Sequence, residues 1–233
     1  MSQDVAELVK NMLAGDKSSL AHLISLIERG SPKVPEIMEL VSPFLHHAYR
    51  IGITGLAGSG KSTVIDKLTS IMRSKGITVG IVAVDPSSAI TGGAVLGDRI
   101  RMQQHYLDEG VFIRSMATRG SCGGLSRAVA DTVKLLDASG KDIILIETTG
   151  VGQTETDITG VADTVVVLLV PGFGDSIQLM KAGLIEIADI IVVNKSDLDG
   201  AEILVSEIKD ELSYSPRKAD QALIVTQANS DIA

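Results

Sequence analysis

Residues 55–62 have the types and spacing of a phosphate-binding loop, because Gly-Leu-Ala-Gly-Ser-Gly-Lys-Ser matches G-x-x-x-x-G-K-[ST] at every fixed position. The glycines let the backbone turn tightly, with its N–H groups directed at a triphosphate. Lys61 can reach the β- and γ-phosphates, and the hydroxyl of Ser62 can ligate Mg²⁺. The sequence therefore predicts a site for a nucleoside triphosphate and Mg²⁺. The predicted loop residues are Gly55, Gly58, Ser59, Gly60, Lys61, Ser62 and Thr63.

Two further stretches are expected to end in carboxylates beside this loop. Residues 77–84 read as a strand that runs into Asp85, and residues 142–147 read as a strand that ends at Glu147. Ligands of open α/β sheets lie beyond the carboxyl ends of the strands, where P-loop proteins keep a carboxylate for Mg²⁺. We therefore expect both acids at the nucleotide, although Asp85 could instead form an Asp-Pro turn. Glu147 also starts an acid-x-x-Gly turn, in which the backbone N–H of Gly150 can reach a γ-phosphate.

The stretch between residues 89 and 101 is polar and contains a Gly-Gly pair. It ends with Asp98, Arg99 and Arg101, where a helix that continues to Leu107 is expected to begin. A loop of this composition after the second strand has the position of a nucleotide-sensing switch.

Residues 194–197 read Asn-Lys-Ser-Asp directly after an apolar stretch. In N-K-x-D the aspartate accepts hydrogen bonds from N1–H and the exocyclic amino group of guanine, so Asn194, Lys195 and Asp197 are assigned to the base. We expect the Asp197 carboxylate to be buried, with Gln227 and Ala228 adding a backbone contact. The tetrapeptide alone is weak evidence, but it is strong when it follows a P-loop and an acid-x-x-Gly turn in this order.

The elements that must position these residues alternate from residue 50 onward, which predicts a mostly parallel sheet with helices on both faces. The fold class is therefore α/β, of the P-loop NTPase type, with residues 48–233 as the nucleotide-binding domain. Residues 1–47 are expected to form a small segment of two or three helices, with breaks at residues 18–19 and 31–32. That segment could support the domain or dock a partner. Further strands are expected at 111–115, 164–170, 190–193 and 221–226, and helices at 62–74, 125–136, 176–188 and 201–212.

Composition narrows the function classes further. The chain has 233 residues, a net charge of −8 and a single cysteine, Cys122. No Lys/Arg-rich stripe is present to neutralise phosphates, so nucleic-acid binding is not expected. No apolar run reaches the roughly 18 residues of a membrane span, and one cysteine fits a reducing cytoplasm. The pair His46-His47 lacks further ligands at metal spacing and is expected on the surface.

Together these motifs make the chain resemble the MeaB/ArgK-type GTPases, the chaperones of adenosylcobalamin-dependent methylmalonyl-CoA mutase. The resemblance covers nearly the whole chain and rests on residues 55–63, 84–88, 92–102, 147–155, 171–181 and 194–197. It implies GTP or GDP with Mg²⁺ as ligands and a B12-dependent acyl-CoA mutase as partner. It also implies that Ser62, Asp85, Asp98 and Glu147 surround the Mg²⁺. Loops 88–101, 149–160 and 171–181 would be the nucleotide-responsive switches.

The chain departs from this family in two respects. Thr149 stands where the family usually has valine, which we expect to matter little. The family's C-terminal helices and dimerisation arm do not follow the last strand, so a homodimer is possible but does not follow from the resemblance.

The residues expected to take part in hydrolysis are Lys61, Glu147, Gly150, Asp98 and Arg101.

Two other classes share parts of the pattern. A nickel-delivery GTPase would need clustered Cys and His ligands, whereas this chain has four scattered histidines and one cysteine. A small-molecule kinase could use the P-loop but would have no use for N-K-x-D. A Mg²⁺-dependent GTPase that gates the loading or protection of a B12 enzyme is therefore the preferred interpretation.

Overall fold

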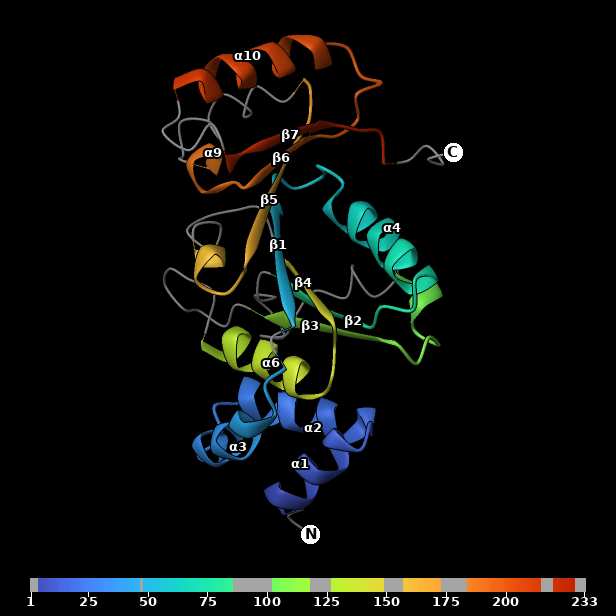
Figure 1. The fold of residues 1–233 in the computed structure, drawn as a ribbon, viewed down its shortest axis with the longest axis vertical. Coiled ribbons are helices and arrows are strands. Elements are labelled where there is room, and N and C mark those ends of the chain that lie inside the picture. Colours follow the sequence, from blue (N-terminus) through green and yellow to red (C-terminus); the bar gives the residue numbers. More distant parts are fainter. Residues whose placement is uncertain are drawn as a thin grey trace, which may run out of the picture.

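A computed structural model describes residues 4–46, 48–85, 102–117, 127–148, 157–172, 184–214 and 220–228. Its strands form one parallel sheet of seven members, as the sequence predicts (Figure 1). The strands are β1 Tyr49–Gly55, β2 Val79–Asp85, β3 Val111–Ala117, β4 Ile143–Glu147, β5 Thr164–Leu169, β6 Ile190–Val193 and β7 Ala222–Val225. Their order across the sheet is β3-β2-β4-β1-β5-β6-β7. Since β1 lies at the centre, the phosphate-binding loop that follows it is at the middle of the carboxyl edge.

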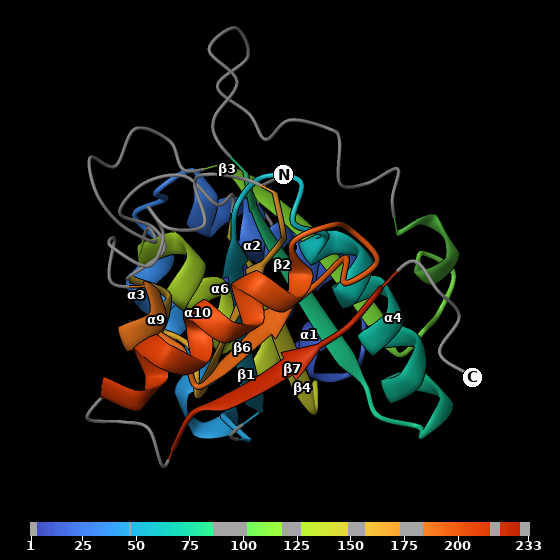
Figure 2. The ribbon, with the colours of Figure 1, turned by 90° about the horizontal axis from the view of Figure 1, so that it is seen from above.

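Helices cover both faces of this sheet, which confirms the predicted α/β class of the P-loop type. Helix α4 packs on one face, where Ile65 shares a core with Ile81 and Leu145. Helix α6 packs on the other face, where Leu136 shares a core with Ile146. Figure 2 shows α4 on one side of the strands and α6 and α9 on the other. The bounds are α4 Lys61–Ser74, α6 Arg127–Ala138, α9 Leu184–Ile187 and α10 Ala201–Tyr214.

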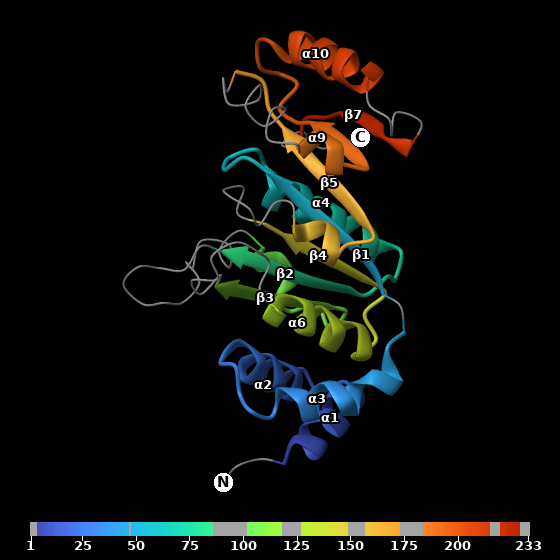
Figure 3. The ribbon, with the colours of Figure 1, turned by 90° about the vertical axis from the view of Figure 1, so that its left-hand side faces the viewer.

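The N-terminal helices pack beneath α6 and share its core (Figure 3). Leu23 and Ile24 of α2 are fully buried in the same cluster as Leu135 and Leu136. This packing is what a structural support for the nucleotide-binding domain requires, whereas the division into two domains after residue 47 stays a prediction. The bounds are α1 Val5–Leu13, α2 Lys17–Glu28, α3 Val34–Val41 and the 3₁₀ turn η1 Ser42–Phe44.

The expected helix break at residues 18–19 is wrong, because both serines lie in the first turn of α2. The Asp16 side chain caps this helix and accepts the backbone N–H groups of Ser18 at 3.1 Å and Ser19 at 2.9 Å. Gly15, with φ of 95°, supplies the preceding turn. The break at residues 31–32 is confirmed, since α2 ends at Glu28 and α3 begins at Val34.

Two expected helices differ in the described structure. Residues 98–107 were expected to be helical, but after residue 101 the chain forms only the 3₁₀ turn η2 Gln103–His105 among the described residues. Of residues 176–188, the described part is helical only at Leu184–Ile187, and Ala188 is already outside α9. A further 3₁₀ turn, η3 Ile158–Gly160, lies just before β5.

Carboxylates at the amino ends of two strands accept hydrogen bonds that favour their charged form. Asp142, just before β4, accepts the backbone N–H and the hydroxyl of Thr78, each at 2.7 Å. Asp108, before β3, accepts two N–H groups from the guanidinium of Arg73, each at 2.9 Å. The bonds from Thr78 lower the pKa of Asp142, and the bond from Arg73 lowers the pKa of Asp108.

We predict that Asp142 stabilises the fold at neutral pH and ceases to do so in acid. Its folded pKa is below its ordinary value of 3.8. The stabilisation is therefore present above that value and is lost as the pH falls through the folded pKa. Asp142→Asn is expected to lower the free energy of unfolding by about 1 kcal/mol at neutral pH, after allowance for solvent screening. Urea unfolding followed by circular dichroism at a series of pH values measures this.

The matched control is Asp210→Asn, which removes an exposed carboxylate on α10. The difference between wild type and Asp142→Asn should shrink as the pH falls below the ordinary carboxyl value, whereas the control should behave like wild type throughout. A deficit of Asp142→Asn that is the same at every pH would contradict the role of its charge.

Candidate nucleotide site

The phosphate-binding loop lies between β1 and α4, and two of its backbone carbonyl oxygens accept hydrogen bonds from the side chain of Lys61. Lys61 is 7% exposed, and its Nζ donates to the carbonyl oxygens of Gly55 at 2.8 Å and Leu56 at 2.9 Å. The ammonium group is therefore already inside the loop. A charge fixed there can meet the β- and γ-phosphates of a nucleotide without a large rearrangement.

Two glycines of the loop are required by close approach as well as by conformation. Gly55 has φ of 138°, and a Cβ there would lie 2.2 Å from the carbonyl oxygen of Leu168 on β5. Gly60 has φ of 93°, and its Cβ would lie 2.4 Å from Nδ2 of Asn194. Gly60 immediately precedes α4 and leaves the first-turn N–H groups of that helix oriented toward the loop. The prediction of tight turns at these glycines is confirmed.

Ser62 and Glu147 meet although they are 85 residues apart in the sequence. The Ser62 hydroxyl donates to Oε1 of Glu147 at 2.8 Å, and both residues are 6% exposed. Ser62 is in the first turn of α4, while Glu147 ends β4, where it pairs in register with Ile53 of β1. A buried hydroxyl and a buried carboxylate at one point are hard oxygen donors of the kind that Mg²⁺ prefers. The donor set therefore fits the predicted metal.

The remaining predicted metal and hydrolysis residues are located only in part. Asp85 ends β2, and Ala83, two residues earlier, pairs in register with Glu147. This places the backbone of Asp85 at the same sheet edge as the loop. Asp98, Arg101 and Gly150 lie outside the described residues.

Asn194 connects three loops of the site. It is 2% exposed, its Nδ2 donates to the carbonyl oxygen of Ser59 at 2.8 Å, and its Oδ1 accepts the backbone N–H of Ala228 at 3.0 Å. Ser59 is fully buried in the phosphate-binding loop. The residues predicted to read the base are thus tied directly to the residues predicted to hold the phosphates.

Two details differ from the sequence prediction at this end of the site. Asp197 is exposed, so the expectation that the chain itself buries this carboxylate is wrong. It lies in the turn that follows β6, beyond the edge of the sheet. The N–H of Ala228 is engaged by Asn194, so this donor braces the loop within the chain, whereas Gln227 is half-buried beside it.

Lys195 has the only positive φ among the described non-glycine residues, at 57°. A left-handed conformation costs free energy in a residue with a Cβ, and such positions gather at functional sites. The N–H of Ser196 donates to the carbonyl oxygen of Thr226 at 3.2 Å, which fixes the turn against the end of β7. Asp197 follows two residues later in the same turn.

One positioning contact had no signal in the sequence. Thr148, which follows Glu147, is buried and donates through Oγ1 to Oγ1 of Thr54 at 2.8 Å. Its backbone N–H also donates to the carbonyl oxygen of Ile53 at 3.1 Å. The end of β4 is therefore locked to the strand that enters the phosphate-binding loop, which fixes Glu147 relative to Ser62.

Within the described ranges, no group of three or more His, Cys, Asp and Glu side chains is arranged to hold a metal ion. His46 is exposed, as predicted. In the same part of the chain, no helix has the length and apolar character needed to cross a membrane.

This fold and this site define a P-loop nucleoside triphosphatase that carries the tetrapeptide N-K-x-D, which is predicted to read guanine. The model of the family described as Methylmalonyl Co-A mutase-associated GTPase MeaB matches residues 20–228. The chain therefore belongs to the MeaB family of GTPases, which confirms the resemblance found in the sequence.

Relatives agree with this assignment. A Pyrococcus horikoshii protein named as a GTPase is 52% identical over 93% of this chain and 68% of its own length. The GTPase ArgK of Escherichia coli is 36% identical over 84% of this chain and 60% of its own length. The chain thus spans about two thirds or less of the length of these relatives.

Solved structures agree on the fold. A crystal structure described as LAO/AO transport system kinase has a TM-score of 0.74 and 27% identity, and the match covers 95% of this chain and 68% of that one. HypB from Helicobacter pylori in complex with nickel has a TM-score of 0.59 and 19% identity, covering 85% of this chain and 86% of that one. At that identity the HypB likeness concerns the fold alone.

Proposed function

We propose that this protein binds and hydrolyses GTP with Mg²⁺, and thereby gates the loading or protection of adenosylcobalamin in a B12-dependent acyl-CoA mutase. The observation that carries the nucleotide part is the double hydrogen bond of Asn194, which joins the guanine tetrapeptide to the phosphate-binding loop. The family description, which names methylmalonyl-CoA mutase, supports the partner. A 36% identical relative from Caenorhabditis elegans is named a methylmalonic aciduria type A homolog.

The chain's own residues divide the work of binding. Lys61 would neutralise charge on the β- and γ-phosphates from inside the loop. Ser62 and Glu147 would hold Mg²⁺, with Asp85 and Asp98 completing its surroundings. Bound there, Mg²⁺ would supply electrostatic stabilisation of the phosphate oxygens. Asp197 would read the base.

Hydrolysis requires groups at the γ-phosphate. The backbone N–H of Gly150 would donate to it, and Arg99, Arg101 or an arginine of the partner would stabilise the developing charge. In the sequence, the residue directly after the acid-x-x-Gly turn is Val151, whose side chain can neither donate nor accept. Nothing at that position can orient the attacking water, as a glutamine does in Ras-like proteins.

We predict slow hydrolysis by the isolated protein and acceleration by the mutase. Single-turnover hydrolysis of GTP should rise by about tenfold or more when the mutase is added, because a missing stabilising group is worth several orders of magnitude in GTPases. Binding to the mutase should also differ between GDP and a non-hydrolysable GTP analogue in a pull-down experiment. An unrelated acyl-CoA enzyme of similar size is the control.

Each part of the proposal can fail by itself. Fast hydrolysis by the isolated protein, equal to the rate with the mutase, would remove the gating role and leave a simple GTPase. Mutase binding that is the same with GDP, with the analogue and without nucleotide would remove the coupling. Failure to bind guanine nucleotides at all would remove the nucleotide part.

A further inference from the structure

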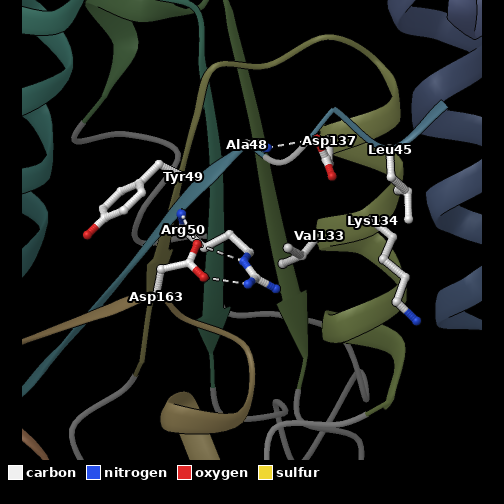
Figure 4. Close-up of a pocket in the computed structure, with 8 residues that line it drawn as sticks. All are labelled: Leu45, Ala48, Tyr49, Arg50, Val133, Lys134, Asp137 and Asp163. Atoms are coloured by element: carbon white, nitrogen blue, oxygen red, sulfur yellow. Dashed lines mark hydrogen bonds and ion pairs between the residues drawn. The ribbon is translucent and has the colours of Figure 1, made fainter.

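A cavity of about 450 Å³ lies at the opposite end of the sheet from the nucleotide site. It is bounded by the chain that leads into β1, by the start of β1, by α6 and by the residue before β5 (Figure 4). Its volume is within the range of small-molecule sites. The lining residues are Leu45, Ala48, Tyr49, Arg50, Val133, Lys134, Asp137 and Asp163.

One wall of the cavity is a guanidinium held in a fixed orientation. Arg50 donates to Asp163 through Nε at 2.9 Å and through Nη2 at 2.5 Å, and the backbone N–H of Arg50 donates to the same carboxylate at 2.9 Å. Figure 4 shows the side chain reaching from β1 toward Val133 on α6. A guanidinium has five N–H groups, and Asp163 accepts two of them, so three remain. Among the described residues, only Asp163 accepts from this guanidinium.

The second carboxylate at the cavity has a structural task. Oδ1 of Asp137 accepts the backbone N–H groups of Ala48 at 2.9 Å and His46 at 3.0 Å, which fixes the linker from the N-terminal helices to β1. The ammonium of Lys134 is at the rim, half-exposed, with its nearest carboxylate oxygen 3.5 Å away on Asp131. The cavity therefore offers the remaining N–H groups of Arg50 and, at its rim, the ammonium of Lys134, which also bonds to Asp131, while both acids accept hydrogen bonds from the protein.

The other walls are apolar. The side chains of Leu45, Ala48 and Val133 form these walls, and Val133 is 4% exposed. Tyr49 borders the cavity at the start of β1, but its ring points away from Arg50 and Val133 in Figure 4, with its hydroxyl 2.5 Å from Oγ1 of Thr164. An occupant must therefore combine an apolar body with an acceptor group for Arg50.

We propose that this cavity binds an organic carboxylate with an apolar body, whose carboxylate accepts from the guanidinium of Arg50. Lys134 adds a second positive charge at the rim. Arg50 and Lys134 balance Asp137 and Asp163 in charge, so recognition comes from directed hydrogen bonds and apolar contact and not from a net field. Affinity is accordingly expected in the millimolar range, about 1 mM for a six-carbon acid.

The experiment compares ligands that share one six-carbon body. Protein labelled with ¹³C at its Leu and Val methyl groups is titrated with hexanoate, hexanamide and hexylamine at constant ionic strength. Hexanoate should shift the methyl signals of Leu45 and Val133 and should bind about three- to tenfold more tightly than hexanamide, because a charged acceptor strengthens the bonds to Arg50. Hexylamine should leave these signals in place. The methyls of Leu56 report on any anion that binds the phosphate loop instead.

Two variants test the donors, with one control. Arg50→Lys keeps the positive charge but removes the planar set of N–H donors of the guanidinium. Lys134→Met removes the positive charge at the rim from a half-exposed residue. Each substitution should weaken the binding of hexanoate by about threefold or more. Lys209→Met, on the exposed face of α10, should leave this affinity unchanged. If Arg50→Lys does not fold, the affinity of Lys134→Met for hexanoate tests the proposal by itself.

Three results would overturn the proposal. The first is the absence of shifts at Leu45 and Val133, including the case in which hexanoate perturbs only Leu56. The second is equal binding of hexanoate and hexylamine. The third is wild-type affinity for hexanoate in each variant that folds.

Discussion

Lys61→Ala is expected to abolish productive GTP binding and to leave the fold intact. The ammonium of Lys61 is buried within the loop, 2.8 and 2.9 Å from two carbonyl oxygens. Losing two charge-assisted hydrogen bonds to phosphate, each worth about 1.5–3 kcal/mol, weakens binding by about 10²–10⁴-fold. Calorimetric titration with GDP and with a GTP analogue measures the loss, and far-UV circular dichroism checks the fold.

Lys75→Ala is the matched control for this prediction. Lys75 follows the last residue of the same helix, is exposed, and lies at the end of α4 that is remote from the loop. It should bind nucleotides like wild type. If Lys61→Ala keeps both its circular dichroism spectrum and its rate of GTP hydrolysis, the assignment of the phosphate-binding loop is wrong.

Asp197→Asn is expected to change the preferred base from guanine to xanthine. Guanine offers N1–H and a 2-amino group to the carboxylate, whereas xanthine has a 2-oxo group that suits the donor of an asparagine amide. The substitution therefore removes the charged acceptor of two hydrogen bonds from guanine. The exposed position of Asp197 favours the lower end of their range, so GDP affinity should fall by about 10²-fold. Affinity for XDP should rise.

A competition series of GDP, ADP and XDP against each protein measures this change. Asp199→Asn is the matched control, because Asp199 is also exposed and is only two residues away. It should keep the wild-type preference. Equal binding of ADP and GDP by wild type, or an equal loss of all three nucleotides in Asp197→Asn, would show that Asp197 does not read the base.

The parts of the site that could be predicted from the sequence are those that follow from local spacing or from sheet topology. The phosphate-binding loop is a local pattern, and the helix after it, predicted at 62–74, begins one residue earlier and ends where predicted. The meeting of Ser62 and Glu147 follows from topology, because parallel strands bring their carboxyl ends to one edge.

What escaped prediction depends on contacts between distant segments or on competition between local preferences. The bond from Asn194 to Ser59 spans 135 residues, and no spacing rule indicates it. The bond between Thr54 and Thr148 spans 94 residues. Near residue 18, two serines look like a helix break, but the preceding Asp16 satisfies their N–H groups and starts the helix there.

The amide of Asn194 also bears on how a bound nucleotide would leave. Because the same side chain bonds to Ser59 in the phosphate-binding loop and to Ala228 beside the base, neither loop can shift without straining the other. We therefore expect dissociation to be a concerted event, in which the phosphate and base ends of the ligand are released together. A factor that pulls on either loop would accelerate exchange of the whole nucleotide, so a partner need not contact both ends of the pocket to empty it.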